Sequence, residues 1–124
     1  MALTYSTAVK NARLEAVVTQ IGTTGVLEIG TTGMASVLAT IALGNPAGTA
    51  ASGILTFSGF PRSDTAADNT GTAAAARIRT ATAGTDVVTA LSVGLSGSDI
   101  NLDSLSITTG QTVTINSMTI THAA

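Results

Sequence analysis

Hydrophobic and polar positions follow a helical period only near the start of the chain. Four apolar residues there are spaced i, i+3, i+4 and i+7 and so share one helix face: Leu14, Val17, Val18 and Ile21. Ser6 is a suitable N-cap, and Gly22 follows the last apolar residue, where helices commonly end. This pattern predicts a helix from about Thr7 to Gln20.

After Gly22 the pattern changes to short alternating segments that are separated by glycine turns. The predicted strands occupy residues 26–30, 35–43, 53–59, 72–82, 85–94, 99–108 and 111–122. Ile78, between two arginines, favours a strand over a helix in the alanine-rich segment, and the turn at Ala83-Gly84 predicts a hairpin. In the last strand the alternation changes phase at Asn116-Ser117, which predicts a bulge or a bend.

Seven or eight short strands at roughly ten-residue spacing, with no helix between them, indicate an all-β fold, either a β-sandwich or a jelly roll. The helical segment precedes them and is expected to flank the sheets. We therefore predict two parts: residues 1–21 as an N-terminal arm and helix, and residues 22–124 as a β-sandwich domain that folds on its own.

The composition is unusual for a protein that works alone in water. Threonine is the commonest residue and alanine the second, whereas aromatic residues make up 2% of the chain. Charged residues make up 10%, compared with about 25% in typical soluble domains. A core of small side chains and a weakly charged surface predict a protein that is stabilised by packing against copies of itself or against a larger assembly.

Charge, hydropathy and cysteine content argue against several partners. The net charge is −2 and the five basic residues are scattered, so no nucleic-acid partner is expected. No apolar run reaches the roughly 18 residues of a spanning helix, so no membrane partner is expected either. The polar start of the chain is unlike a signal peptide. The chain has no cysteine, which excludes disulfides and thiolate metal sites.

Catalytic and cofactor-binding residues are not predicted anywhere in the chain, and the protein is not expected to be an enzyme. The single histidine, His122, stands two residues before the end, and no G-x-S-x-G nucleophile motif is present. The few acidic and aromatic residues also argue against a glycosidase cleft.

One segment has the spacing of a calcium loop at its start. Asp99, Asn101 and Asp103 alternate, but Ser104 replaces the required glycine and Gly110 the required glutamate. We therefore expect a polar strand face there and no metal site.

In the long irregular segment 60–71, two further acidic residues are expected to hold the loop through Asx-turns. These are Asp64 and Asp68, with Arg62 as a possible ion-pair partner.

Five residues are candidate partner contacts: Tyr5, Lys10, Arg13, Arg77 and Arg79. The first three belong to the arm and helix, and segments of this kind readily bridge subunits. The last two share one strand face because they are two residues apart. That face is either a binding patch for an acidic partner surface or a solvated face.

Three parts of the sequence together resemble a known group of proteins. They are "TYSTAVKNARLEAV" near the start, "LATIALGNPAGT" with "GILTFSG" in the middle, and "LSVGLSGSDINLDSLSITTGQTVTINSMTITHA" at the end. This chain resembles small structural proteins of tailed bacteriophages and prophages over nearly its whole length. The resemblance includes no catalytic motif and carries over no functional residue.

The resemblance implies a virion component that is made in the host bacterial cytoplasm. The first expectation is a capsid decoration (cement) protein that binds between capsomers, stabilises the head, and contacts both itself and the major capsid protein. The alternative is a tail or head–tail connector ring subunit. A receptor- or sugar-binding module is a third reading, which the scarcity of aromatic residues disfavours.

Overall fold

A computed structural model describes residues 3–121 of the chain. The fold is mostly sheet, with one N-terminal helix and several antiparallel sheets. The predicted β-rich fold with an N-terminal helix is confirmed at this level.

The helix α1 (Thr7–Ile21) has the caps that the sequence predicts. The Ser6 hydroxyl accepts a hydrogen bond from the Val9 amide at 3.3 Å. Gly22 ends the helix with φ 71°, a left-handed conformation that glycine adopts without steric cost, and its N–H donates to the Val18 carbonyl.

The first sheet has four antiparallel strands. Their order is β2 (Val37–Ala42), β1 (Val26–Gly30), β7 (Ala75–Arg79) and β8 (Asp86–Leu91). A short 3₁₀ turn, η1 (Thr32–Met34), lies between β1 and β2. The alanine-rich segment is a strand, and its hairpin with the following strand is present as predicted.

The second sheet is built around the long strand β12. Its order is β3 (Gly48–Ala51), β4 (Ile54–Phe57), β12 (Val113–Thr121), β10 (Ile100–Leu102) and β9 (Val93–Gly94), and β5 (Arg62–Asp64) also pairs with β12. Only β10 and β9 are parallel among its pairings in the described residues. Two short strands, β6 (Gly71–Thr72) and β11 (Ser106–Ile107), form a separate pair.

The phase change in β12 is a bulge, one of the two predicted irregularities. Asn101 pairs with Ser117 and Leu102 pairs with Ile115, so Asn116 is an extra residue on the β12 side. The bulge lets both Ile115 and Met118 face the core although they are three residues apart.

The number of strands differs from the prediction. The described residues form twelve strands, whereas seven or eight were expected. The additional strands are two to four residues long: β3, β5, β6, β9 and β11. Segments this short show no alternation of apolar and polar residues that could be recognised in the sequence. Whether they form strands depends on pairing with segments that are distant in the sequence.

The segment between β4 and β6 covers the outer edge of β2. The Asp64 Oδ2 atom accepts a hydrogen bond from the Thr40 amide at 3.0 Å, and the Asp68 amide donates to the Leu38 carbonyl at 2.7 Å. The Asn69 side chain donates to the Val37 carbonyl at 2.8 Å. These bonds satisfy backbone groups that an open sheet edge would otherwise offer to other chains.

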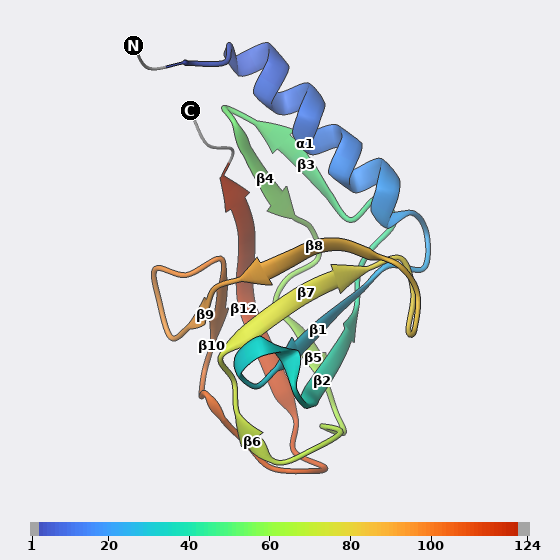
Figure 1. The fold of residues 1–124 in the computed structure, drawn as a ribbon, viewed down its shortest axis with the longest axis vertical. Coiled ribbons are helices and arrows are strands. Elements are labelled where there is room, and N and C mark those ends of the chain that lie inside the picture. The colour runs from blue at the N-terminus through green and yellow to red at the C-terminus, as the bar shows by residue number, and fades with distance from the viewer. Residues whose placement is uncertain (1–2, 122–124) are drawn as a thin grey trace.

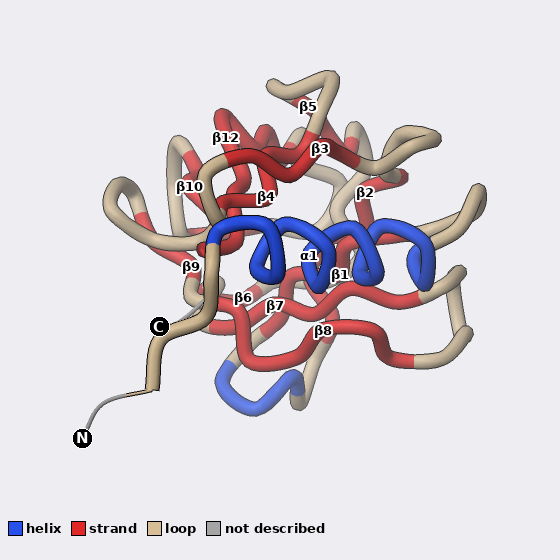
Figure 2. The backbone as a smooth tube through the Cα atoms, turned by 90° about the horizontal axis from the view of Figure 1, so that it is seen from above, coloured by secondary structure: helices blue, strands red, loops and turns tan. Residues whose placement is uncertain are grey.

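Helix α1 packs against both sheets. It contacts β3 and β4 of the second sheet and β8 of the first, and it lies across one end of the molecule (Figure 1) between β3 and β8 (Figure 2). Leu14 is 3% exposed and Ile21 1% exposed, and both belong to the single core cluster that the two sheets share. The division into residues 1–21 and a domain of residues 22–124 that folds on its own stays a prediction.

Replacing Leu14 by alanine tests whether α1 is part of the core. Because Leu14 is almost fully buried, L14A should lower the free energy of unfolding by about 3 kcal/mol, the usual cost of such a cavity. Urea denaturation followed by circular dichroism measures the change.

The matched control is V9A, on the exposed side of the same helix, which should change stability by less than about 0.5 kcal/mol. Equal small effects of the two variants would show that the helix is an appendage.

Candidate functional site

An ion-pair network crosses the outer face of the first sheet. Glu28 on β1 stands directly opposite Arg77 on β7, and the Arg77 Nε atom donates to its carboxylate at 2.7 Å. Arg79 lies diagonally, with its Nη1 atom 3.7 Å from the same carboxylate oxygen. Arg79 also stands opposite Asp86 on β8, to which its Nε atom donates at 2.8 Å. Charges of alternating sign therefore join three strands.

Glu28 is the buried member of this network. The residue is 5% exposed, although it points away from the core that Leu27 and Ile29 enter. A buried carboxylate is tolerated when it is paired and hydrogen-bonded, and the two arginines provide both. Glu28 thus holds the two guanidinium groups in fixed positions on the sheet.

Arg77 and Arg79 share one face, as the sequence predicts, but both are engaged within the chain. Arg79 contacts two carboxylates, whereas Arg77 uses only its Nε atom for contacts within residues 3–121. The formal charges of the network cancel, which weakens its attraction for an acidic surface compared with two unpaired arginines. A partner contact at these two residues stays a prediction.

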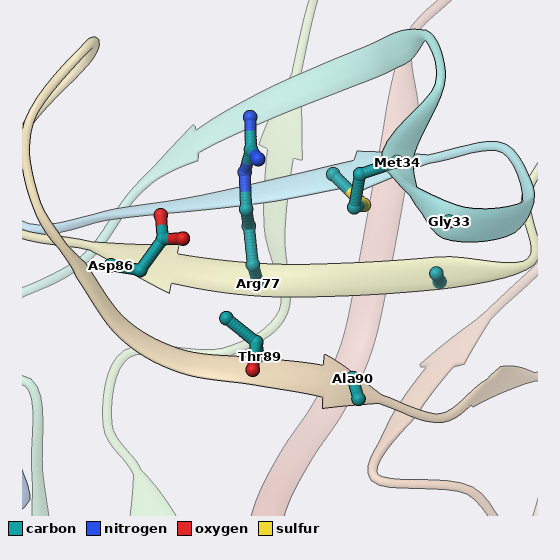
Figure 3. Close-up of a pocket in the computed structure, with 7 residues that line it drawn as sticks. Gly33, Met34, Arg77, Asp86, Thr89 and Ala90 are labelled. Carbon is teal, nitrogen blue, oxygen red and sulfur yellow. The ribbon is translucent and has the colours of Figure 1, made fainter.

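A pocket of about 330 Å³ adjoins the network. It is lined by residues of η1, β7 and β8: Gly33, Met34, Ala75, Arg77, Asp86, Thr89 and Ala90. Figure 3 shows Arg77 and Asp86 towards one end and Met34 and Gly33 towards the other. One end of the pocket is therefore charged and the other is mainly apolar.

Two non-glycine residues of the pocket have a left-handed backbone. Met34 has φ 59° and Ala90 has φ 60°, and the neighbouring Gly33 has φ 69°. This conformation costs an L-residue about 1 kcal/mol. The walls of the pocket therefore retain local strain that the surrounding sheet must hold in place.

The other predicted contact residues are Lys10 and Arg13 on the first half of α1 and Tyr5 just before it. The Arg13 guanidinium stacks over the Tyr5 ring at 4.8 Å from its centroid, so the structure brings these two side chains together. Lys10 lies beside the β3–β4 turn, where the neighbouring Asn11 side chain accepts a hydrogen bond from the Gly53 amide at 2.9 Å. These three residues belong to a different part of the fold from Arg77 and Arg79.

The residues that resemble the start of a calcium loop have separate partners. The Asp99 carboxylate accepts from the Ser92 amide, the Asn101 side chain from the Ser98 amide, and the Asp103 carboxylate from the Asn116 side chain. Within residues 3–121, no group of three or more His, Cys, Asp or Glu side chains is placed to hold a metal ion.

In the long loop, Asp64 forms the predicted Asx-turn with the Ala66 amide at 3.0 Å. Asp68 accepts from the Thr40 hydroxyl at 3.3 Å. Arg62 donates to the Ser58 and Ala42 carbonyls rather than to an acidic residue of the loop.

His122, the single histidine of the chain, lies outside the described residues. Of the helices in the described part of the chain, none is long and apolar enough to cross a membrane.

Sequence reasoning missed Glu28 and Asp86 as members of the site. A signal for Glu28 was present, because a lone glutamate in the apolar strand Val26–Gly30 needs a cationic partner. The arginine pair two residues apart on one strand face was the matching half of that signal. Asp86 gave no comparable signal, since only the register of β7 with β8 places it opposite Arg79.

The chain was compared with models of protein families, with curated proteins and with solved structures, and nothing matches it in any of the three comparisons.

Removing the Glu28 carboxylate tests whether the network holds the sheet together. E28A should lower the free energy of unfolding by about 3 kcal/mol, because it leaves two arginines without their buried partner. Chemical denaturation of E28A against E15A, an exposed glutamate on α1, isolates this effect. A loss in E28A no larger than that in E15A would contradict a structural role of the network.

A second test concerns metal binding. Because the polar groups of Asp99, Asn101 and Asp103 are directed to separate protein partners, adding EDTA or calcium should leave the melting temperature unchanged. Differential scanning calorimetry measures it. A decrease of several degrees with EDTA that calcium reverses would show that a cation binds.

Proposed function

We propose that this protein is a non-enzymatic structural component of a bacteriophage virion, and that it acts as a capsid decoration protein. In this proposal the two larger sheets form a β-sandwich that sits between capsomers and contacts the major capsid protein and further copies of itself. The protein is made in the bacterial cytoplasm and functions on the virion. The sequence resemblance to small phage structural proteins motivates the proposal.

One structural observation carries the proposal furthest: the protein uses its few charged groups internally. Every charged side chain outside α1 makes an ion pair or hydrogen bond within the described chain. The exposed positions of the strands are mostly threonine, serine and alanine. Such a surface loses little solvation of charge when another protein covers it, and interface centres are depleted of charged residues for this reason.

The three remaining charged residues all lie on α1, two of them among the predicted contacts, Lys10 and Arg13. The Arg13 guanidinium and the Tyr5 ring form one amphipathic surface near the start of the helix. In our proposal this surface binds the capsid. Because α1 also packs on both sheets, it presents these side chains from a rigid base.

A decoration protein of this kind acts by mass action. It binds the assembled lattice and not the free subunits, so each occupied site stabilises the assembled state. Many weak contacts that are repeated over the head add up to a large total effect. The chain therefore needs no catalytic group for this function.

Copy number and binding to heads test the proposal together. Mass spectrometry of purified virions should find hundreds of copies, and heads that lack the protein should regain it from solution. The K10A/R13A double variant should bind such heads about tenfold more weakly, because it removes both cations of α1. Electron microscopy of heads with and without the protein locates the density.

The control variant is E15A on the same helix, which should bind heads like the wild type. A copy number of six or twelve would instead support the alternative, a ring subunit of the tail or connector. Absence from virions would contradict both.

A further inference from the structure

We propose that the pocket beside the ion-pair network receives the side chain of Leu95 from a second copy of this chain. The inference rests on the proposed function in assuming that the protein assembles, and it names the partner and the contact. Met34, Ala75 and Ala90 line the apolar part of this pocket.

The pocket has the properties of a preformed binding site. Its volume of about 330 Å³ lies within the range of roughly 300–1,000 Å³ of small-molecule pockets, ample for one aliphatic side chain with part of its backbone. Met34 and Ala90 are held with a left-handed backbone on two different elements. Strained residues of this kind are concentrated where a structure shapes a site for a ligand.

The polar end of the pocket fits a neutral peptide group. Arg77 donates to Glu28 through Nε alone, so its two terminal nitrogens have no partner in the described chain. Asp86 likewise uses only Oδ1, and the Thr89 hydroxyl makes no hydrogen bond there. Donors and acceptors are thus both available. A backbone amide offers a carbonyl and an N–H to match them, and the cancelled charges of the network favour such an uncharged occupant.

Leu95 has the features expected of the occupant. It is 60% exposed in the loop between β9 and β10, which projects from the side of the molecule (Figure 1). The following loop residues Ser96, Gly97 and Ser98 carry no charge. An exposed leucine flanked by uncharged peptide groups matches a pocket that has an apolar end and a polar end whose two opposite charges cancel.

The loop is also fixed at its base, which lowers the entropic cost of docking. The Ser92 amide donates to the Asp99 carboxylate at 3.1 Å, and the Asp99 amide donates to the Ser92 hydroxyl at 2.9 Å. The Ser98 amide donates to the Asn101 side chain at 3.1 Å. A loop held in this way loses little freedom when its tip is bound.

Each copy carries both Leu95 and the pocket, so every copy in the assembly gives one such contact and receives another. A reciprocal exchange closes a dimer, and a one-way contact repeats from copy to copy until a ring closes. Each contact is small, and the assembly gains stability because every copy makes two of them.

Disulfide trapping tests the contact directly, because the chain contains no cysteine. L95C is mixed with an epitope-tagged A75C variant under mild oxidation, and tagged-to-untagged dimers are quantified. We expect several-fold more of this product than from L3C mixed with tagged A75C, a matched exposed leucine that lies 70% exposed before α1. Equal yields from the two mixtures would overturn the proposal.

Sedimentation analysis of the full chain gives a second readout. L95S should weaken self-association at least tenfold. Because Leu95 is exposed in the single chain, the melting temperature measured at concentrations where the wild type is monomeric should not change. A75L, which fills the pocket, should weaken self-association similarly, and L3S should not.

The outcomes separate this inference from the proposed function. Wild-type self-association that L95S and A75L leave intact would overturn the Leu95 contact while assembly itself stands. A wild type that is monomeric at every concentration would overturn the second copy as occupant, and presence in virions would still support the structural role. Weakening by L3S and not by L95S would assign the pocket to another segment and overturn the proposal.

Discussion

The packing of α1 between the two larger sheets is the contact on which the rest of the fold depends. A chain with so few aromatic residues fills its core mainly with leucine, isoleucine and alanine, and each of these buries a modest area. The helix adds Leu14 and Ile21 at the end where the strands β8 and β3 would otherwise leave the core open. The helix also packs against β3 and β8, which are edge strands of the two sheets. Edge strands offer backbone groups to other chains, and the long loop covers the edge of β2 in a similar way.

The ion-pair network and the core packing favour the same register of the first sheet. Glu28 lies opposite Arg77 only in one alignment of β1 and β7. A slip by one residue would turn Glu28 towards the core and expose Leu27, which is fully buried in the observed alignment. The charged pair therefore reinforces the alignment that the burial of Leu27 requires. The same pair positions Arg77 beside the pocket.

The elements with strong local patterns could be predicted from the sequence, and those defined by distant partners could not. The helix, its caps and the bulge at Asn116 follow from residues within one or two turns of chain. The strands β6 and β11 consist of two residues each. They form only because they pair with each other, and more than thirty residues separate them in the sequence. The site shows the same division: the shared face of Arg77 and Arg79 was visible in the sequence, whereas the pocket depends on η1 and β8 meeting over β7. The packing of α1 on the shared core could not be predicted either, because an amphipathic helix pattern does not indicate which surface the apolar face packs against.

The position of β12 in the second sheet has a consequence for how the chain folds. This strand follows every other strand in the sequence, yet it pairs with β4, β5 and β10 at successive points along its length. Until β12 is in place, these three strands lack a common partner, and the first sheet has no opposing layer on which to pack. Pairing β12 with β4 and β5 closes two long loops, which is slow compared with folding through local contacts. A chain that has not completed this step exposes unpaired strand edges and needs protection from aggregation while it is being made.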